Sequence, residues 1–558
     1  MSSQGESAEG ASRGLARFLR FFRPSHQHTA FSATLLLMSA VMLSRVIGYL
    51  REAYIAWAFG AGPATDAYVA GFTIPDWLNY LVAGGTASIT FVSIYTRFLT
   101  EKREDEARET MSVIITVMTA VLGIGIVLTE IFTPQIVAWW FGPHAGAKGF
   151  TPDQLALCTH LTRILLPAQV FFYVGGIFAA VLLSHRLFLL PALGPLLYNL
   201  SIIVGGVVAS RHLGISSLAW GALLGSFLGP FLISMVGAAR MHTGYSLSFD
   251  IRNPAFREWV RLSIPLMLGV SLVSADDWIL RHFASGNIGD ITRLNYAKRL
   301  LAVPIAVLGQ AASQASLPFF ARLWGEKRRH EFAETVNGSV YRIVAASLLA
   351  SSFMMAASLP MIDLVYRRGH FLFTDSQETA IYFFWFSLSL AFWSAQGLYS
   401  RAFYAAGNTM TPMIASSLIT LASLPMYYAL YRALSTVGLA IASDVGIAAN
   451  TLALAILLHW RKLVPSEQLQ WGELGKAGMI ALVAGVLSHE VARTIMVSGN
   501  RMADVESLGL VTLTWAAAVA AGLWMTRSQL LRDLRRRKAT PYPRVAEAGG
   551  ELSAGIEP

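Results

Sequence analysis

Apolar runs long enough to cross a lipid bilayer recur along the whole chain. A bilayer-spanning helix needs about 20 predominantly apolar residues, and about fourteen runs of that length can be marked in the sequence. The pattern predicts an all-α polytopic membrane protein with about 14 transmembrane helices. The predicted spans lie near residues 29–59, 65–98, 108–132, 154–183, 187–210, 216–239, 259–284, 289–323, 336–361, 377–406, 410–432, 437–460, 474–496 and 507–526.

Several of these spans contain proline or a glycine pair in their interior. Such residues free backbone groups, which neighbouring helices must then bond. Broken spans of this kind are frequent in transporters. The residues concerned are Pro75, Gly84-Gly85, Pro167, Pro265, Pro304 and Pro318.

The chain contains an internal repeat. Residues 84–103 (GGTASITFVSIYTRFLTEKR) and 309–328 (GQAASQASLPFFARLWGEKR) share Gly, Ala-Ser, an aromatic residue, Arg and Glu-Lys-Arg at one offset of 225. Two further matches have an offset of 221, namely Gly176 with Gly397 and Pro191 with Pro412. A repeated unit of six spans keeps its orientation. We therefore expect two six-helix lobes related by an axis along the membrane normal, with a substrate site between them.

The repeat also predicts the organisation of the chain. We expect two additional C-terminal helices beyond the two lobes. The expected segments are a cytoplasmic arm at 1–28, an N-terminal lobe at 29–240, a cytoplasmic linker at 241–258, a C-terminal lobe at 259–462, the two additional spans at 463–527 and a cytoplasmic basic tail at 528–558.

Lysine and arginine are distributed unequally between the two sides of the predicted membrane. With the N-terminus in the cytoplasm, the inside connections and tails carry about 28 of the 43 basic residues, and the outside connections carry about seven. Basic residues are in excess on the cytoplasmic side of membrane proteins. We therefore expect both termini in the cytoplasm and an even number of spans.

Composition excludes several other classes. The chain has 558 residues, of which 54% are hydrophobic and 14% charged, whereas a soluble protein carries roughly 25% charged residues. The single cysteine, Cys158, excludes an internal disulfide. Zinc-ligand spacings, a Walker loop and a Rossmann fingerprint are absent from the sequence, so we expect no cofactor and no metal. In a membrane protein the net charge of +10 fits cytoplasmic loops and lipid headgroups better than nucleic acid.

Basic side chains lie inside the predicted spans. The first span contains Ser44 to Glu52, with Arg45 and Arg51, and the eighth contains Lys298 and Arg299. A charged side chain at membrane depth is costly and normally faces a cavity or a partner. Because the arginine fork matches phosphate oxygens in a bidentate manner, these four residues predict a diphosphate site between the lobes.

Other interpretations of the charged residues stay open. Arg51 could reach the outer interface or pair with Asp66, and Arg299 could form an interhelical ion pair. Asp66 could cap the helix after the turn at residues 60–66, or act in gating or proton relay. Asp277, with its neighbour Asp276, could be a coupling site or a partner of Arg281.

Two stretches resemble a known family. SRVIGYLREAYIAWAFGAGPATDAYVAGFTIPD, residues 44–76, is similar to the opening of the MurJ/MviN family of lipid II flippases. NYAKRLLAVPIAVLGQAASQASLPFFAR, residues 295–322, is similar to that family's eighth span. These flippases belong to the multidrug/oligosaccharidyl-lipid/polysaccharide exporter superfamily, and the resemblance covers nearly the whole chain.

The resemblance implies a transporter of the bacterial cytoplasmic (inner) membrane. It would carry undecaprenyl-diphosphate-linked peptidoglycan precursor outward by alternating access, driven by membrane potential or by a coupling ion (H⁺, Na⁺ or Cl⁻). Arg45, Arg51 and Arg299 stand where the family's cavity arginines stand, and Asp66 stands where its second-helix aspartate stands. Glu52, Asp66 and Asp277 are the candidates for gating or coupling. The two C-terminal helices would form a groove for the lipid tail.

The sequence departs from the family pattern at four places. Asn79-Tyr80 replaces an arginine pair, Ala83-Gly84-Gly85 replaces Ala-Glu-Gly, and Lys298 replaces an acidic residue. The polar ligands of a sodium site are not evident around residues 423–427. Lys298 is expected to restore the charge of the missing arginine.

Two other functions remain as alternatives. The first is an exporter of another polyprenyl-diphosphate-linked oligosaccharide or a multidrug/cation antiporter of the same superfamily. A drug exporter should favour an acidic, aromatic cavity, which the basic excess argues against. The second is a membrane enzyme or a scaffold. An enzyme of this kind should have paired carboxylates or a large outer loop, and the longest outer connection, 133–153, shows no such constellation.

Overall fold

The computed structural model describes residues 30–80, 85–143, 148–185, 187–241, 243–268, 272–495 and 501–532. Nearly all of this part of the chain is helical, and no strand occurs in it. The expected cytoplasmic arm, residues 1–28, lies outside the described residues, as do residues 81–84, which include the first residue of the repeat, and most of the expected basic tail.

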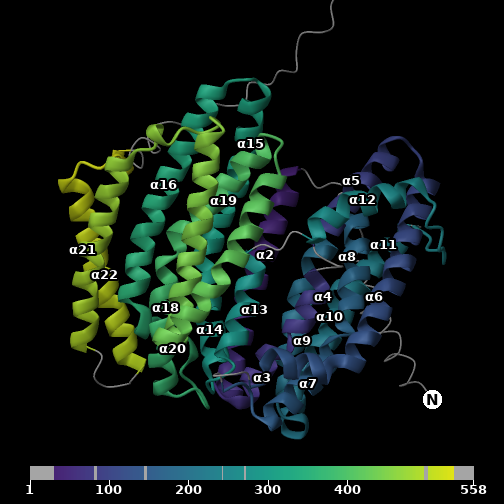
Figure 1. Ribbon diagram of the computed structural model, residues 1–558, viewed down its shortest axis with the longest axis horizontal. Helices are drawn as coiled ribbons and strands as arrows, with labels where there is room; N and C mark the ends of the chain where they lie inside the picture. Colours follow the sequence, from purple (N-terminus) through teal and green to yellow (C-terminus); the bar gives the residue numbers. More distant parts are fainter. Residues whose placement is uncertain are drawn as a thin grey trace, which may run out of the picture. The chain divides into compact units, whose positions relative to one another are not determined.

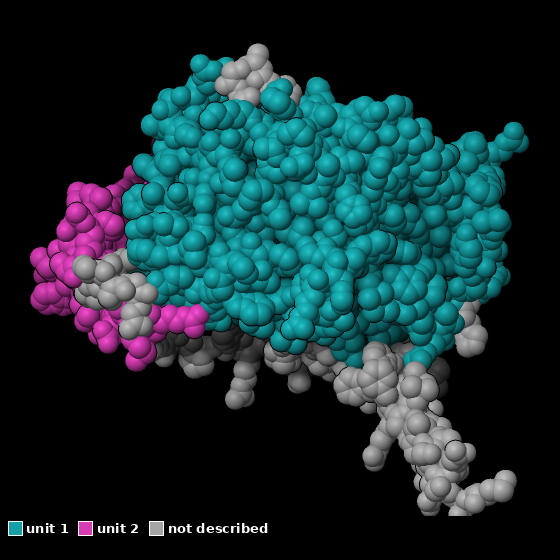
Figure 2. Space-filling model, turned by 90° about the horizontal axis from the view of Figure 1, so that it is seen from below, with its two compact units in different colours: residues 1–303, 358–386, 409–450 teal, residues 304–357, 387–408, 451–558 magenta. Residues whose placement is uncertain are grey.

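The helices form two compact units (Figure 2). Unit 1 comprises Met1–Val303, Ser358–Phe386 and Thr409–Asn450, and unit 2 comprises Pro304–Ala357, Ser387–Asn408 and Thr451–Pro558. These boundaries differ from those of the lobes expected at 29–240 and 259–462, and the lobes remain a prediction.

Unit 1 contains the first thirteen α-helices of the described chain, a π-helix and two later helices (Figure 1). They are α2 (Ala30–Phe59), α3 (Pro63–Gly71), α4 (Thr73–Leu78), α5 (Gly85–Thr100), α6 (Glu104–Phe141), α7 (Pro152–Leu165), α8 (Ala168–Ser184), α9 (Leu189–Leu213), α10 (Ser216–Ser226), the π-helix η2 (Phe227–Ile233), α11 (Ser234–Ala239), α12 (Pro254–Leu268), α13 (Leu272–Ala284), α14 (Asp290–Pro304), α17 (Ser358–Tyr366) and α18 (Phe373–Leu388).

Unit 2 contains the remaining helices, and α20 (Met410–Trp460) passes from unit 1 into unit 2 after Asn450. Its other elements are the π-helix η3 (Ile305–Ala311), α15 (Ala312–Gly325), α16 (Arg329–Ala356), α19 (Leu390–Ala405), the 3-10 helix η4 (Ser466–Gln468), α21 (Trp471–Ile495) and α22 (Arg501–Met525). In this unit α21 and α22 pack on each other and on α16 (Figure 1). Their common core contains Leu349, Ile480, Ala484 and Val519.

Nine helices of the described chain are long and apolar enough to cross a membrane. They are Glu104–Phe141, Pro152–Ser184, Leu189–Leu213, Ser216–Ala239, Asp290–Gly325, Arg329–Ala356, Met410–Trp460, Trp471–Thr494 and Arg501–Met525. Helices also occupy the described residues of the other four predicted spans, at 29–59, 65–98, 259–284 and 377–406, except for short turns. The expected all-helical, polytopic fold is therefore confirmed, and the number fourteen stays a prediction.

Prolines interrupt the helices at several of the predicted places. The α3 helix gives way to α4 just before Pro75, and α7 ends two residues before Pro167. At Pro304 the α-helical hydrogen bonding of α14 changes to the π-helix η3. Proline removes a backbone donor and clashes with the preceding turn, so each break follows from the local sequence.

Close packing of α9 against α10 positions two polar residues of α9. A Cβ on Gly205 would lie 2.9 Å from the Cα of Gly221 in α10, and a Cβ on Gly221 would lie 2.7 Å from Ser201 O. Only glycine allows two helix backbones to approach so closely, as is common between membrane helices. The α9 helix also packs against α2. Tyr198 and Asn199 of α9 are thereby held next to α2.

The turns after α5 and α15 have the same geometry, which extends the internal repeat to three dimensions. In each turn the arginine of Glu-Lys-Arg donates hydrogen bonds to two glutamates, and its own N–H bonds the carbonyl five residues earlier. The arginine pairs with the glutamate two residues before it and with the one three residues after it, namely Arg103 with Glu101 and Glu106, and Arg328 with Glu326 and Glu331.

Four helices are followed by a basic residue in a left-handed backbone conformation. Lys102, Lys327, Lys462 and Arg527 have φ of 57°, 60°, 55° and 47°, and each lies two residues after the end of α5, α15, α20 or α22. Glycine is the usual residue in this conformation at a helix C-terminus. A basic side chain there interacts favourably with the last carbonyl groups and with the helix dipole.

An ion pair connects the end of α5 to the start of α12. Arg97 donates two hydrogen bonds, of 2.9 and 2.6 Å, to the two carboxylate oxygens of Glu258. Glu258 lies just before the predicted span at 259–284. These hydrogen bonds from Arg97 hold the pKa of Glu258 below its usual value. The carboxylate therefore stays ionised at neutral pH and keeps the two helix ends together.

The α20 helix consists of two helices joined at Ser435. Ser435 has φ 54° and ψ −142°, outside the helical range. Gly214, which precedes it by the repeat offset of 221, has φ 55° and ψ −137°. The repeat has therefore kept a backbone conformation that suits glycine, with serine in the second half.

We expect Ser435→Gly to raise the free energy of unfolding by about 1 kcal/mol, because a non-glycine residue in this region is strained. The side-chain hydrogen bond that Ser435 accepts from Asn287, which this change removes, is long at 3.3 Å. Thermal unfolding of the purified protein in detergent measures the change.

Gly214→Ala is the matched control. A Cβ at Gly214 meets no atom within 4 Å, so this variant should be destabilised through backbone strain alone. An unfolding temperature of Ser435→Gly below that of the wild type would contradict the strain at Ser435.

Candidate functional site

Unit 1 contains a pocket of about 270 Å³ that gathers charged side chains from four helices. Three arginines and two carboxylates line it, together with aromatic and apolar walls. The lining residues are Arg51, Glu52, Ile55, Tyr68, Val69, Phe72, Asp76, Tyr198, Arg281, Asn295, Tyr296 and Arg299.

Arg51 enters the pocket from α2 and is nearly buried. Its guanidinium forms an ion pair with the neighbouring Glu52 and donates a 2.8 Å hydrogen bond to Asn199 Oδ1 of α9. Its Nε is buried and has no acceptor among the described residues. Arg51 pairs with Glu52, so the predicted alternative of a pair with Asp66 is wrong in this structure.

Arg299 of α14 lies on the other side of Glu52. Its Nε is 3.8 Å from Glu52 Oε1, and half of its side chain is exposed. One carboxylate therefore serves two guanidiniums, which come from the first and the second half of the sequence. This arrangement brings together Arg51 and Arg299, two of the four residues expected to bind a diphosphate.

Arg45 lies one helical turn before Tyr49 on α2. Tyr49 donates a 2.7 Å hydrogen bond to the backbone oxygen of Arg299, and Arg45 and Arg299 both lie close enough to act electrostatically on Tyr49. Arg45 is partly exposed and is not among the residues that line the pocket. The structure thus places Arg45 outside the pocket lining, on the face of α2 that bears Tyr49 and contacts α14.

Arg281 and Asp76 form a second ion pair in the pocket, which sequence reasoning missed as part of the site. Arg281 Nη1 of α13 lies 3.0 Å from Asp76 Oδ2 of α4 and 3.2 Å from Thr73 Oγ1. The Arg281 side chain is 10% exposed, whereas that of Asp76 is 44% exposed. The sequence placed Arg281 inside a span, and Asp76 ends the stretch that resembles the family's opening, but no pattern connected them.

Lys298 points to a different polar cluster. Its Nζ lies 2.6 Å from Asp276 Oδ2 and also bonds Asp277. Asp276 is buried and accepts further hydrogen bonds from Tyr427 and from Ser443 of α20. Lys298 does not line the pocket. Two carboxylates balance its charge. Lys298 therefore does not take the place of the missing cavity arginine in this structure, contrary to the expectation from the sequence.

The predicted partnership of Asp276 or Asp277 with Arg281 is likewise not found. Arg281 bonds Asp76, and both aspartates bond Lys298. Asp277 is half-exposed, with 48% of its side chain accessible, while Asp276 is 2% exposed. Asn79, at the place of the family's arginine pair, donates a 2.8 Å hydrogen bond to Gln169.

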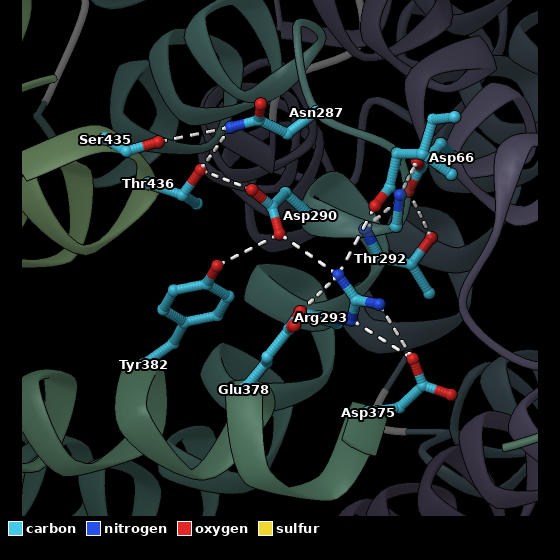
Figure 3. A network of polar contacts seen from close by, with 12 residues as sticks. Asp66, Asn287, Asp290, Thr292, Arg293, Asp375, Glu378, Tyr382, Ser435 and Thr436 are labelled. Atoms are coloured by element: carbon cyan, nitrogen blue, oxygen red, sulfur yellow. Dashed lines mark hydrogen bonds and ion pairs between the residues drawn. The ribbon is translucent and has the colours of Figure 1, made fainter. Parts of the chain in front are cut away.

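Asp66 does not cap its own helix. Thr65 accepts the hydrogen bond from the Gly62 N–H at the start of α3, whereas Asp66 accepts hydrogen bonds from the backbone N–H groups of Gly289 and Thr292 and from Thr292 Oγ1 (Figure 3). The carboxylate therefore caps the N-terminus of α14, where negative charge is favourable. Asp66 connects the turn after the first span to the helix that carries Arg299.

The same end of α14 is held by a larger polar network (Figure 3). Arg293 forms ion pairs with Asp290, Asp375 and Glu378. Asp290 in turn accepts hydrogen bonds from Tyr382 and Thr436. The start of α14 is thus fixed to α3, α18 and the second part of α20. These contacts also fix the position of Arg299, which lies two turns later on the same helix.

The arrangement is suited to binding an anion. Guanidiniums surrounded by aromatic and apolar side chains act in a medium of low dielectric constant, where charge–charge interactions are strong. Groups of three or more His, Cys, Asp or Glu that could bind a metal ion do not occur in the described part of the chain. Arginine forks of this kind match the geometry of phosphate oxygens.

Comparison with known proteins shows the family to which this chain is related. The family described as "Lipid II flippase MurJ" matches residues 55–497. The lipid II flippase MurJ of Burkholderia cenocepacia is 26% identical over 91% of this chain and 99% of its own length. The probable lipid II flippase MurJ of Rhizobium tropici is 24% identical over 92% of this chain and 98% of its own length.

Solved structures share the fold. A structure described as lipid II flippase MurJ in an inward closed conformation has a TM-score of 0.73 at 22% identity, over 90% of this chain and all of that chain. An inward-facing multidrug resistance MATE family transporter of the MOP superfamily has a TM-score of 0.60 at 15% identity, over 76% of this chain and 97% of that chain. At these identities the likeness concerns the fold alone.

The family match covers most of the chain, and the resemblance noted at residues 44–76 and 295–322 is confirmed. This chain is a multi-pass membrane protein that belongs to the MurJ family of lipid II flippases.

Proposed function

We propose that this protein moves lipid II, the undecaprenyl-diphosphate-linked peptidoglycan precursor, from the inner to the outer leaflet of the bacterial cytoplasmic membrane. It acts as a transporter by alternating access and not as an enzyme, and it serves cell-wall synthesis. The family and the names of its relatives support this proposal. The observation that carries it is the pocket in which Arg51, Arg281 and Arg299 meet.

The diphosphate is the part of lipid II that we place in this pocket. A volume of about 270 Å³ is below the roughly 300–1,000 Å³ of sites that enclose a whole small ligand. It accommodates a diphosphate, and the sugar and peptide parts need additional space. Arg45, on the face of α2 that bears Tyr49, is the further basic residue that we propose for the diphosphate.

The basic excess favours a lipid-linked diphosphate over a cationic drug. Three arginines and two carboxylates line the pocket, and the MATE structures share only the fold. An exporter of another polyprenyl-diphosphate-linked oligosaccharide would use the same phosphate contacts. Binding of labelled lipid II to the purified protein, compared with other polyprenyl diphosphates, separates these two functions.

We propose gating or coupling roles for Glu52, Asp66 and Asp277. Glu52 is shared by Arg51 and Arg299, so an arriving diphosphate competes with it for both. Asp66 holds the start of α14 by hydrogen bonds. This helix has to move if Arg299 is to become accessible from the other side of the membrane. Asp277 is a half-exposed carboxylate bonded to Lys298 and responds to any displacement of that ammonium. The driving force in this proposal is the membrane potential or a coupling ion.

We further propose two six-span lobes, with α21 and α22 forming a groove for the lipid tail and both termini in the cytoplasm. The basic residues in left-handed conformation support the orientation. All four, at Lys102, Lys327, Lys462 and Arg527, fall on the predicted cytoplasmic side, where basic residues are in excess.

We expect Arg45→Ala and Arg299→Ala each to abolish or strongly reduce complementation in a flippase-depletion strain. Losing one charge-assisted contact to phosphate should weaken lipid II binding by about tenfold or more. Growth after depletion and binding of labelled lipid II to purified protein measure the two effects.

Arg163→Ala is the matched control, because Arg163 is an exposed arginine of α7 whose partner is Glu130. It should complement normally. Full rescue by both Arg45→Ala and Arg299→Ala would remove the phosphate role of these residues.

We expect a membrane-impermeant maleimide to label Arg368→Cys, but not Gln470→Cys, in intact spheroplasts. Both positions are exposed, and they lie on the predicted outer and inner sides. The background is Cys158→Ser, which removes the single buried cysteine. Labelling of both variants after membrane permeabilisation shows that both sites are reactive. The reverse pattern in intact spheroplasts would contradict the proposed orientation.

We expect Asp66→Ala to lower complementation and to speed maleimide labelling at Asn287→Cys, in the loop before α14. The substitution removes the acceptor for two backbone N–H groups and one hydroxyl at the start of α14. The matched control is Asp153→Ala in the first turn of α7. Unchanged labelling and normal growth of Asp66→Ala would eliminate the gating role.

A further inference from the structure

The pocket contains a positive charge that the family resemblance does not provide. The residue expected to compensate for the missing cavity arginine, Lys298, is bonded to Asp276 and Asp277. Asn79, at the missing position, is bonded to Gln169. Arg281 is the third arginine that lines the pocket, alongside Arg51 and Arg299.

Arg281 is well placed to bind an anion. Its side chain is 10% exposed, so its charge is little screened by solvent. Its hydrogen bonds to described residues all use Nη1. A guanidinium presents five N–H donors in a rigid fork, so the other donors can contact phosphate oxygens while Nη1 keeps Thr73.

Asp76 occupies the position of an exchangeable counter-ion. It belongs to α4 and shares the pocket with Arg281, and 44% of its side chain is exposed. A buried arginine without an anion is strongly unfavourable. An anion that leaves Arg281 must therefore be replaced by another, and Asp76 is the carboxylate within bonding distance.

We propose that Arg281 is a diphosphate-binding residue of this pocket, and that Asp76 is an internal stand-in for the phosphate, which the diphosphate displaces on binding and which reclaims Arg281 on release. This inference rests on the proposed function. Exchange of one anion for another keeps Arg281 paired in both states, so the substrate is bound without the permanent affinity that would prevent its release.

The test is a double-mutant cycle read out as the dissociation constant for labelled lipid II on the purified full-length protein. Arg281→Gln should weaken binding about tenfold, the effect of losing a charged hydrogen-bonding partner. Asp76→Asn should tighten binding several-fold, because the competing carboxylate is lost. The double variant Asp76→Asn/Arg281→Gln should bind as weakly as Arg281→Gln alone.

A merely structural role of the pair predicts different results. If Arg281 only neutralises Asp76, removing both charges together should restore wild-type affinity, and Asp76→Asn alone should not tighten binding. Either result overturns the proposal. Arg281→Lys, which keeps the charge, should recover part of the affinity, and Arg163→Gln, outside the pocket, should bind as the wild type does.

Two further measurements keep the outcomes distinct. Thermal unfolding of each variant shows whether it is folded. If a single variant is unstable because one charge has lost its partner, the double variant, which has lost both charges, still gives a measurement. Arg299→Ala in the same assay tests the proposed function by itself. If Arg299→Ala abolishes binding while Arg281→Gln leaves it unchanged, the inference fails and the proposed function stands. If neither variant affects binding, both fail.

Discussion

Pairing of arginine and lysine with carboxylates inside a helical membrane protein is the constraint on which this structure depends. Glu52 serves Arg51 and Arg299, Asp76 serves Arg281, and two aspartates serve Lys298. Removing one partner of a buried pair typically costs about 3–5 kcal/mol, because the other charge is left without compensation. These pairs connect α2, α4, α13 and α14. The positions of the helices and the positions of the charges therefore determine each other, and two of these sets of ion pairs line one pocket.

The ion pairs are of two kinds, which differ in how much of the carboxylate side chain is exposed. Asp276 is 2% exposed and receives an ammonium and two hydroxyls, so its site is filled by the chain itself. Asp76 is 44% exposed in a pocket lined by three arginines, so another anion can replace it. The same chemical pairing is therefore enclosed by the chain at Asp276 and open to the pocket at Asp76. The difference lies in access to the pocket, and residue type alone does not reveal it.

Helix ends give this charged region its position. Asp66 caps α14 from a turn more than 200 residues earlier in the sequence, and Arg293 connects the same end to α18 (Figure 3). The internal repeat preserved backbone geometry more closely than side chains. The turns at Arg103 and Arg328 keep the same ion pairs, while Ser435 retains the conformation of Gly214 without being glycine. Backbone hydrogen bonding at a turn tolerates few alternatives, so the same turn geometry recurs in both copies.

The sequence by itself determined the helical membrane fold, the breaks at prolines, the repeat, and the presence of Arg51 and Arg299 in one charged region. These features depend on hydrophobic length, on local backbone chemistry and on the cost of charge in a bilayer, all of which are readable along the chain. Only the tertiary structure decided which carboxylate meets which cation. It moved Lys298 out of the expected phosphate site, brought Arg281 and Asp76 into it, and assigned Asp66 to a distant helix. Ion pairs form between residues up to about 250 positions apart in the sequence, and their geometry depends on how whole helices pack, which a linear pattern does not encode.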